Sequence, residues 1–221
     1  MEIDKGALRH VLWIGGATDS GKTSVARALA ERFGLQTYHY DLFDRETPPG
    51  HWSRIDPKQH PHMYATNVAD RDWMWVDTTP EVLVQRWRDT VPERFGLTLQ
   101  DLLAMPPHPP IVAEGYGITP SLVAPLLSTP HQAIWLISTE EVKRHIYVQR
   151  GKGRFIDTRD PERARANHMA RDLLLADLIR TEAMSLDMPF IDIDGSQSLE
   201  EVTDTVAAHM APVLRGGVSA N

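Results

Sequence analysis

The 221-residue sequence contains no cysteine. Disulfide bonds, thiolate catalysis and cysteine-ligated metal sites are therefore excluded, and the composition is compatible with a reducing compartment. The sequence also lacks a signal peptide or a membrane span, because the apolar run after residue 10 is short and is soon interrupted by glycine. We predict a cytoplasmic protein with no membrane partner.

The sequence also has no excess of positive charge, since its net charge is −7 at pH 7. Such a chain does not attract a nucleic-acid backbone or an acidic lipid surface as a whole, which argues against both as partners. Residues 142–171 depart from this average, because they hold nine lysines or arginines and three acids. The nine are Lys143, Arg144, Arg150, Lys152, Arg154, Arg159, Arg163, Arg165 and Arg171. A run of this kind is either a solvated surface or a cluster that meets an anionic ligand.

What the sequence does contain is the pattern GxxxxGK[ST], which residues 16–23 fill as GATDSGKT. The apolar run HVLWI precedes it, and an amphipathic segment that ends at Gly34 follows it. A strand before the loop and a helix after it are the context that a phosphate-binding loop requires. With this loop in the chain, we interpret the basic run as a cluster that meets a triphosphate.

Each part of the loop has an expected task in binding ATP and Mg²⁺. The glycines let backbone N–H groups turn toward phosphate oxygens at the start of a helix. Lys22 is expected to reach the β and γ phosphates, and Thr23 to bind Mg²⁺. Asp19 is unusual because an acid repels phosphate, so we expect it to face the acceptor or to cap the loop. The predicted nucleotide-binding residues of the loop are Gly16, Asp19, Ser20, Gly21, Lys22, Thr23 and Ser24.

Signals for strands and helices alternate along the chain, as parallel α/β folds require. Strands are predicted near residues 9–15, 35–40, 109–115, 131–138 and 189–194. Helices are predicted near residues 22–33, 79–88, 97–105, 119–127, 139–150, 160–184 and 198–214. We expect one domain over residues 1–215, followed by a disordered tail at 216–221.

Between the second and third predicted strands, residues 44–105 form a long excursion that we expect to bind the acceptor. Its first part, residues 44–72, is rich in proline, histidine and aromatic side chains and is predicted to be irregular. Its histidines lack the cysteine partners and the helical spacing that are typical of zinc sites. Trp52, Trp73 and Trp75 offer faces on which an organic acceptor can stack.

Three acids lie where the predicted strands end. Asp41 follows the second strand, on the side where the phosphate-binding loop also opens, and can take a proton from an attacking hydroxyl or hold a Mg²⁺-bound water. The alternative for Asp41 is a turn or helix cap. Asp44 lies close enough to share this work at the acceptor. Glu114 ends an apolar strand and is predicted to contact Mg²⁺ through water or to hydrogen-bond the acceptor.

The order of these parts resembles the P-loop small-molecule kinases of the nucleoside and nucleotide kinase group, which include shikimate, gluconate and chloramphenicol kinases. The resemblance rests on GATDSGKT, the acid after the second strand, the GKGR segment at 151–154 and the ending IDIDGSQSLEEV. It implies a P-loop NTPase fold, a three-layer αβα sandwich whose five-stranded parallel sheet has the order 2-3-1-4-5. It also implies a mobile arginine lid, here residues 150–160.

Carried over by position, the resemblance assigns Arg150 to the adenine and phosphates and Arg154 to catalysis as the lid arginine. It makes Arg165 or Arg171 a phosphate-facing arginine, and we place Arg171 at the acceptor. The sequence lacks the acidic pair motif of shikimate kinases, and its region 44–105 matches no acceptor site of the group.

We therefore predict an ATP- and Mg²⁺-dependent phosphotransferase that acts on a hydroxyl of a small-molecule acceptor, with Lys22, Asp41 and Arg154 as catalytic residues. A zeta-toxin-like kinase is an alternative suggested by Asp41 to Arg45 (DLFDR) with His60 and Pro61. A polynucleotide 5′-hydroxyl kinase is suggested by TDSGK in the loop. The non-enzymatic alternative is a nucleotide-binding regulatory protein.

Overall fold

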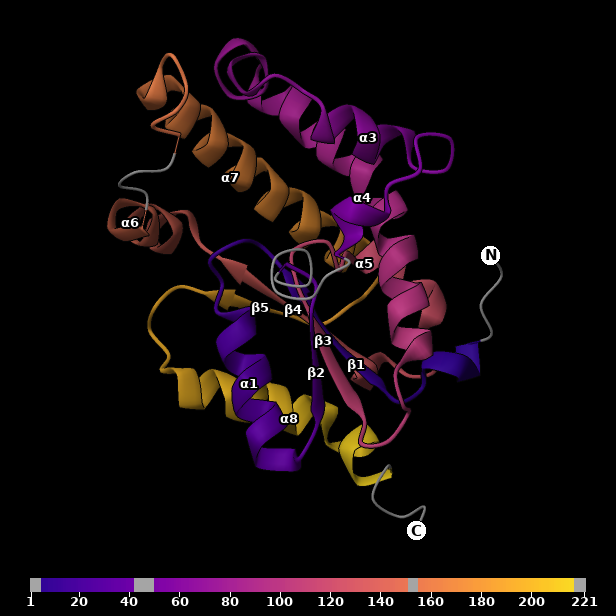
Figure 1. Ribbon diagram of the computed structural model, residues 1–221. Helices are drawn as coiled ribbons and strands as arrows, with labels where there is room; N and C mark the ends of the chain where they lie inside the picture. The colour runs from indigo at the N-terminus through magenta and orange to yellow at the C-terminus, as the bar shows by residue number, and fades with distance from the viewer. Residues whose placement is uncertain (1–4, 42–49, 151–154, 217–221) are drawn as a thin grey trace.

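The computed structural model describes residues 5–41, 50–150 and 155–216. Its centre is a five-stranded parallel sheet (Figure 1). The strands are β1 (Val11–Gly16), β2 (Gln36–His39), β3 (Ile111–Glu114), β4 (Ala133–Ser138) and β5 (Phe190–Ile193). Their order in the sheet is β2-β3-β1-β4-β5, which confirms the predicted order. Helices lie in the connections between successive strands, as parallel pairing requires.

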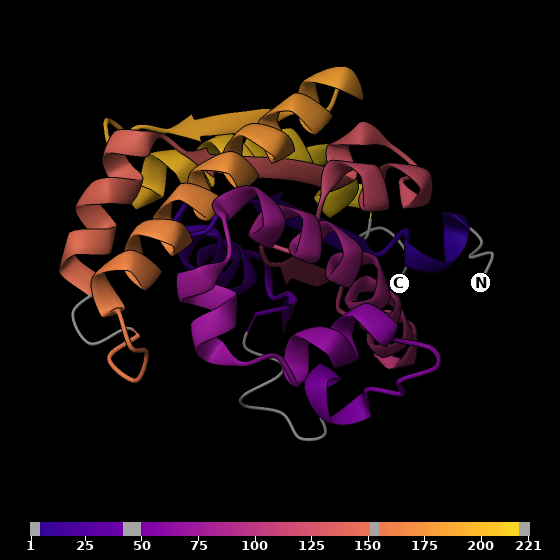
Figure 2. The same cartoon turned by 90° about the horizontal axis from the view of Figure 1, so that it is seen from above.

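Helices cover both faces of the sheet and give the predicted three layers (Figures 1 and 2). One layer contains α1 (Lys22–Phe33) and α8 (Leu199–Gly216), which pack against each other. The opposite layer contains α4 (Pro80–Ala104), α5 (Pro120–Val123) and α7 (Pro161–Ser185). The remaining α-helices are α3 (Pro61–Asn67), which packs on α4, and α6 (Glu140–Arg150), which leads toward α7.

Side chains along the central strands point alternately to the two faces of the sheet, so each strand contributes to two separate parts of the core. Trp13 and Trp135 are fully buried on the face covered by α4 and α7, whereas Ile14 and Leu136 point to the face covered by α1 and α8. Successive side chains of a strand point to opposite faces, so strands covered on both sides need continuous apolar runs. The apolar sequences VLWI and AIWLI therefore become two of the three inner strands of the sheet.

The excursion is more helical than the sequence predicted. The segment 50–72, expected to be irregular, contains a 3₁₀ turn at His51–Arg54 and helix α3. The two expected helices at 79–88 and 97–105 are one continuous helix, α4, with Pro92 inside it.

Burial explains why α4 continues through its proline. The apolar side chains Leu83, Trp87, Val91, Phe95 and Leu99 recur every four residues and are all buried. A proline inside a helix costs about 3 kcal/mol, whereas full burial of one large apolar side chain contributes ~1.5 to 3 kcal/mol. Several such side chains outweigh one proline, so the stripe holds the helix together across Pro92.

A part of the predicted lid and most of the predicted tail fall outside the described residues. Residues 151–154 of the lid and 217–221 of the tail are not described. In the part of the chain that is described, no helix is both long and apolar enough to cross a membrane.

Candidate active site

The loop between β1 and α1 has a backbone that its glycines make possible. Gly16 has φ +127°, and a Cβ atom there would lie 1.9 Å from the carbonyl oxygen of Leu136 in the neighbouring strand. Gly21 has φ +82° immediately before α1 begins. Side chains at these positions would be strained or would clash, so the loop can form only with glycine here.

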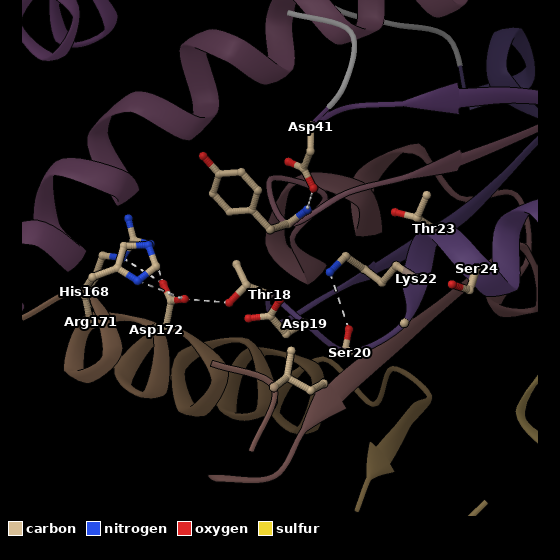
Figure 3. A pocket seen from close by; sticks show the side chains of 13 residues that line it. Thr18, Asp19, Ser20, Lys22, Thr23, Ser24, Asp41, His168, Arg171 and Asp172 are labelled. Atoms are coloured by element: carbon tan, nitrogen blue, oxygen red, sulfur yellow. Dashed lines mark hydrogen bonds and ion pairs between the residues drawn. The ribbon is translucent and has the colours of Figure 1, made fainter. Parts of the chain in front are cut away.

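A cavity of about 590 Å³ opens at the N-terminus of α1 (Figure 3). Its size is within the range of small-molecule sites, and the helix N-terminus contributes a partial positive charge. The lining includes every residue from Thr18 to Ser24, whereas Gly16 shapes the turn behind it. The full lining is Thr18, Asp19, Ser20, Gly21, Lys22, Thr23, Ser24, Asp41, Tyr116, Ile146, His168, Arg171 and Asp172.

Lys22 is 5% exposed and turns its ammonium group back onto the loop. Its Nζ donates to the carbonyl oxygen of Ala17 at 2.5 Å and lies 3.4 Å from Ser20 Oγ. Burial lowers the pKa of Lys22, and the carboxylates of Asp41 and Glu114 offset only part of this effect. A phosphate oxygen in the cavity would compete with the Ala17 carbonyl for the ammonium group.

Thr23 and Glu114 meet beside the loop. Thr23 Oγ1 donates to Glu114 Oε1 at 3.0 Å, and His39 Nδ1 lies 2.9 Å from the same oxygen. Glu114 is fully buried at the end of β3, and its other oxygen, Oε2, has no hydrogen-bond partner among the described residues. A buried carboxylate oxygen without a partner is costly, and Mg²⁺ or its water is the kind of ligand that such oxygens bind. Thr23 and Glu114 therefore fit a Mg²⁺ site.

Asp41 follows β2 and borders the same space as the Lys22 ammonium group (Figure 3). Its Oδ2 accepts a hydrogen bond from the Tyr116 backbone N–H at 3.3 Å, while Oδ1 is buried and has no hydrogen-bond partner in the described structure. Burial raises the pKa of Asp41 to about 6, with Lys22 opposing the shift and Glu114 adding to it. A carboxyl group with this pKa can accept a proton near neutral pH.

Asp19 pairs with a lysine that the sequence analysis did not single out. Where we expected Asp19 to face the acceptor or to cap the loop, its Oδ2 lies 3.0 Å from the ammonium group of Lys143, in the first turns of α6. Lys143 also lies 2.9 Å from Oδ2 of Asp172 and hydrogen-bonds the Thr18 hydroxyl. Burial works against ionisation of Asp172, but Arg171, His168 and Lys143 hold its pKa far below the usual range. The negative charge inside the phosphate-binding loop is therefore neutralised by a buried cation.

Asp19, Lys143 and Asp172 form a buried charged cluster, for which the sequence contains only a weak signal. Lys143 belongs to the basic run and lies just after β4, the strand next to β1. Asp172, however, is 29 residues away in an otherwise ordinary helix, and nothing in its local sequence marks it.

Replacement of Lys143 by methionine is expected to lower the free energy of unfolding by about 3 kcal/mol, because it leaves the buried carboxylate of Asp172 without its lysine. Lys143 is 0% and Asp172 1% exposed in their side chains. Urea denaturation measures the loss. The matched control is Arg144→Met on the same helix, whose exposed pair with Glu140 should contribute under about 1 kcal/mol. Equal losses in the two variants would contradict a central role for the cluster.

A second cavity, of about 210 Å³, adjoins the first, and Tyr116 and Arg171 line both. The Arg171 guanidinium lies 5.2 Å from the centre of the Trp75 ring and 3.1 Å from His168 Nε2. The lining of the second cavity is Tyr40, Trp52, Thr66, Met74, Trp75, Leu83, Arg86, Trp87, Thr90, Val91, Arg94, Tyr116 and Arg171. It thus includes two of the three tryptophans predicted to stack on an acceptor.

Arg165, the alternative to Arg171, lines neither of these cavities, and the remaining predicted site residues are not described. Asp44 and Arg154 lie outside the described residues, and Arg150 ends α6 without a described side chain.

Of the three histidines in the excursion, His51 is buried and hydrogen-bonds Tyr38 and Asp101.

No protein-family model matches the chain, and no curated protein matches it significantly. Among solved structures, the shikimate kinase from Acinetobacter baumannii in complex with shikimate is 15% identical, with a TM-score of 0.46 over 95% of this chain and 98% of that chain. The shikimate kinase from Bacteroides thetaiotaomicron is 10% identical, with a TM-score of 0.47 over 91% of this chain and 98% of that one.

Proposed function

We propose that the protein transfers the γ-phosphate of ATP to a hydroxyl group of a small-molecule acceptor, with Mg²⁺ as the metal ion. The observation that carries this proposal is that Lys22 and Asp41 line one cavity at the phosphate-binding loop, with the carboxylate of Glu114 close enough to act on the charge of Lys22. A loop that binds phosphate serves many purposes, but a carboxyl group poised to accept a proton beside it supports catalysis.

Each residue has one task in this reaction. Backbone N–H groups of the loop and the start of α1 bind the phosphates, and the ammonium group of Lys22 neutralises charge on them. Thr23 and Glu114 hold Mg²⁺, which supplies further neutralisation of phosphate charge. Asp41 orients the acceptor hydroxyl and takes its proton. The acceptor oxygen bonds to the γ-phosphorus as the bond from that phosphorus to the β,γ-bridging oxygen breaks, and ADP leaves.

The second cavity supports a small-molecule acceptor. It shares Tyr116 and Arg171 with the phosphate cavity, and the backbone of Tyr116 donates to Asp41. A molecule that fills the second cavity therefore has a direct route to the proposed base. The net charge of −7 favours such an acceptor over a polynucleotide.

Titration calorimetry with an unreactive ATP analogue, with and without Mg²⁺, tests this proposal. In the unchanged protein we expect Mg²⁺ to tighten binding by about tenfold or more, which corresponds to about 1.4 kcal/mol. Thr23→Val keeps the shape of the side chain but removes the hydroxyl, so the effect of Mg²⁺ should largely disappear. Thr37→Val makes the same change at an exposed position of β2 and should leave the effect intact. Absence of nucleotide binding would contradict the proposal, and Mg²⁺-independent binding would contradict its metal site.

A further inference from the structure

The second cavity is aromatic and positively charged. Its walls include three tryptophans, two tyrosines and three arginines, and no aspartate or glutamate is among the described residues that line it. Its volume of about 210 Å³ is below the range typical of drug-sized ligands, so it suits one ring with short substituents.

Three aromatic rings in the walls of the cavity, those of Tyr40, Tyr116 and Trp87, lie close to one another. Tyr40 and Tyr116 meet edge to face with their centres 5.9 Å apart, and Trp87 lies 6.2 Å from Tyr116. Trp87 is 8% exposed, and its Nε1 is buried with no hydrogen-bond partner in the part of the chain described. These rings form a packed aromatic wall against which a bound ring can stack.

The arginines give the cavity its charge. Arg86 donates to the backbone oxygen of Ala65 and lies 4.7 Å over the Trp73 ring, so its described contacts are with neutral groups. Arg94 is 4% exposed, with its guanidinium 4.0 Å over the Tyr40 ring. Guanidinium groups held against aromatic rings are well placed to bind a carboxylate while the rings bind an apolar body.

The residues of the second cavity differ in whether they also line the phosphate cavity. Tyr116 and Arg171 line both cavities. Arg86 lines the second cavity but not the phosphate cavity. An acceptor can therefore place its hydroxyl at the Tyr116 end, toward Asp41, and its charged group at the Arg86 end.

We propose that the acceptor is a single-ring aromatic compound that carries a hydroxyl group and a negatively charged group, such as a carboxylate. This inference rests on the proposed function and adds the class of its substrate. The ring binds among the tryptophans and tyrosines, the anion binds the arginines, and the hydroxyl meets Asp41. The arginines in the walls disfavour a cationic acceptor.

Three probes of nearly equal shape separate charge from ring stacking. They are 4-hydroxyphenylacetate, which is an anion, tyrosol, which is neutral, and tyramine, which is a cation. Binding of each is measured by calorimetry on the full chain, saturated with an unreactive ATP analogue and Mg²⁺. We expect the anion to bind about tenfold or more tightly than tyrosol. We expect no binding of tyramine at millimolar concentration.

Two arginine variants on α4 locate the effect. Arg86→Gln should reduce the preference for the anion over tyrosol to about threefold or less, while tyrosol still binds. Arg88→Gln removes the same charge at an exposed position of the same helix and should leave the preference unchanged. Because neither residue is part of the core, circular dichroism should show both variants folded.

Other results would overturn the inference. Equal binding of the three probes, preference for tyramine, or no binding of 4-hydroxyphenylacetate at millimolar concentration would each do so. Tighter binding of shikimate would show that a non-aromatic acid is preferred, and tighter binding of uridine monophosphate would show that a nucleotide is. The nucleotide measurement is made first and separately, so failure to bind the ATP analogue contradicts the proposed function, whereas failure of the charge series contradicts only the acceptor class.

Discussion

Replacement of Asp41 by asparagine is expected to lower turnover by ~10² to 10⁴, with little change in ATP affinity. Asparagine keeps the shape and the hydrogen bond to the Tyr116 N–H, but it cannot take a proton from the acceptor. Steady-state kinetics measures the loss, and calorimetry with an ATP analogue measures affinity. Comparable turnover in the variant would show that another residue is the base or that the reaction needs none.

The same substitution has an expected effect on stability that distinguishes a catalytic base from a turn or helix cap. The pKa of Asp41 is raised from 3.8 to about 6, so the folded state binds this proton more tightly than the unfolded chain does. The free energy of unfolding therefore falls as pH rises from about 4 to 6, by about 2 kcal/mol. Asp41→Asn removes this decline and should be more stable than the unchanged protein at pH 7, but not at pH 4.

Denaturation of both proteins across this pH range is the measurement. A capping aspartate would show the opposite, since its loss lowers stability at pH 7. Turnover of the unchanged protein should likewise decrease below about pH 6, because a protonated Asp41 cannot accept the acceptor's proton.

Lys22→Ala is expected to lower turnover by ~10² to 10³ and to weaken ATP binding while the chain stays folded. Among the described residues, the ammonium group of Lys22 hydrogen-bonds Ala17 and Ser20 of its own loop, so the substitution breaks no hydrogen bond between distant elements there. Turnover, nucleotide affinity and circular dichroism are measured together. Lys58→Ala, an exposed lysine in the excursion, is the control for loss of a positive charge. Unchanged affinity and turnover in a folded Lys22→Ala protein would contradict the site.

The phosphate end of the site was predictable because its signal is local. A strand, a loop of fixed spacing and a helix follow one another in residues 10–33, and their positions fix where Lys22 and Thr23 lie. Asp41 and Glu114 could be placed beside them since the ends of parallel strands meet at one edge of the sheet. The order of the strands was not derivable from local patterns and came from the resemblance.

The parts that were missed depend on contacts between distant residues. Lys143 meets Asp19 and Asp172 only after β4 has paired with β1 and α7 has packed, so no short segment reports the cluster. Helix α4 was divided in two because Pro92 reads locally as a break, whereas the buried stripe that carries the helix through it is a tertiary effect. The strands themselves, by contrast, were visible because a strand covered on both faces reads as a continuous apolar run.

The two cavities draw their walls from different parts of the chain. The first cavity is lined by the loop before α1 with the first turn of that helix, by residues that follow β2 and β3, and by side chains of α6 and α7. Most of the second cavity comes from residues 52–94, on α4 and the short helical segments before it. Under the proposed function, mutations in that one stretch of the gene can alter which acceptor is bound while the phosphate-binding loop stays unchanged.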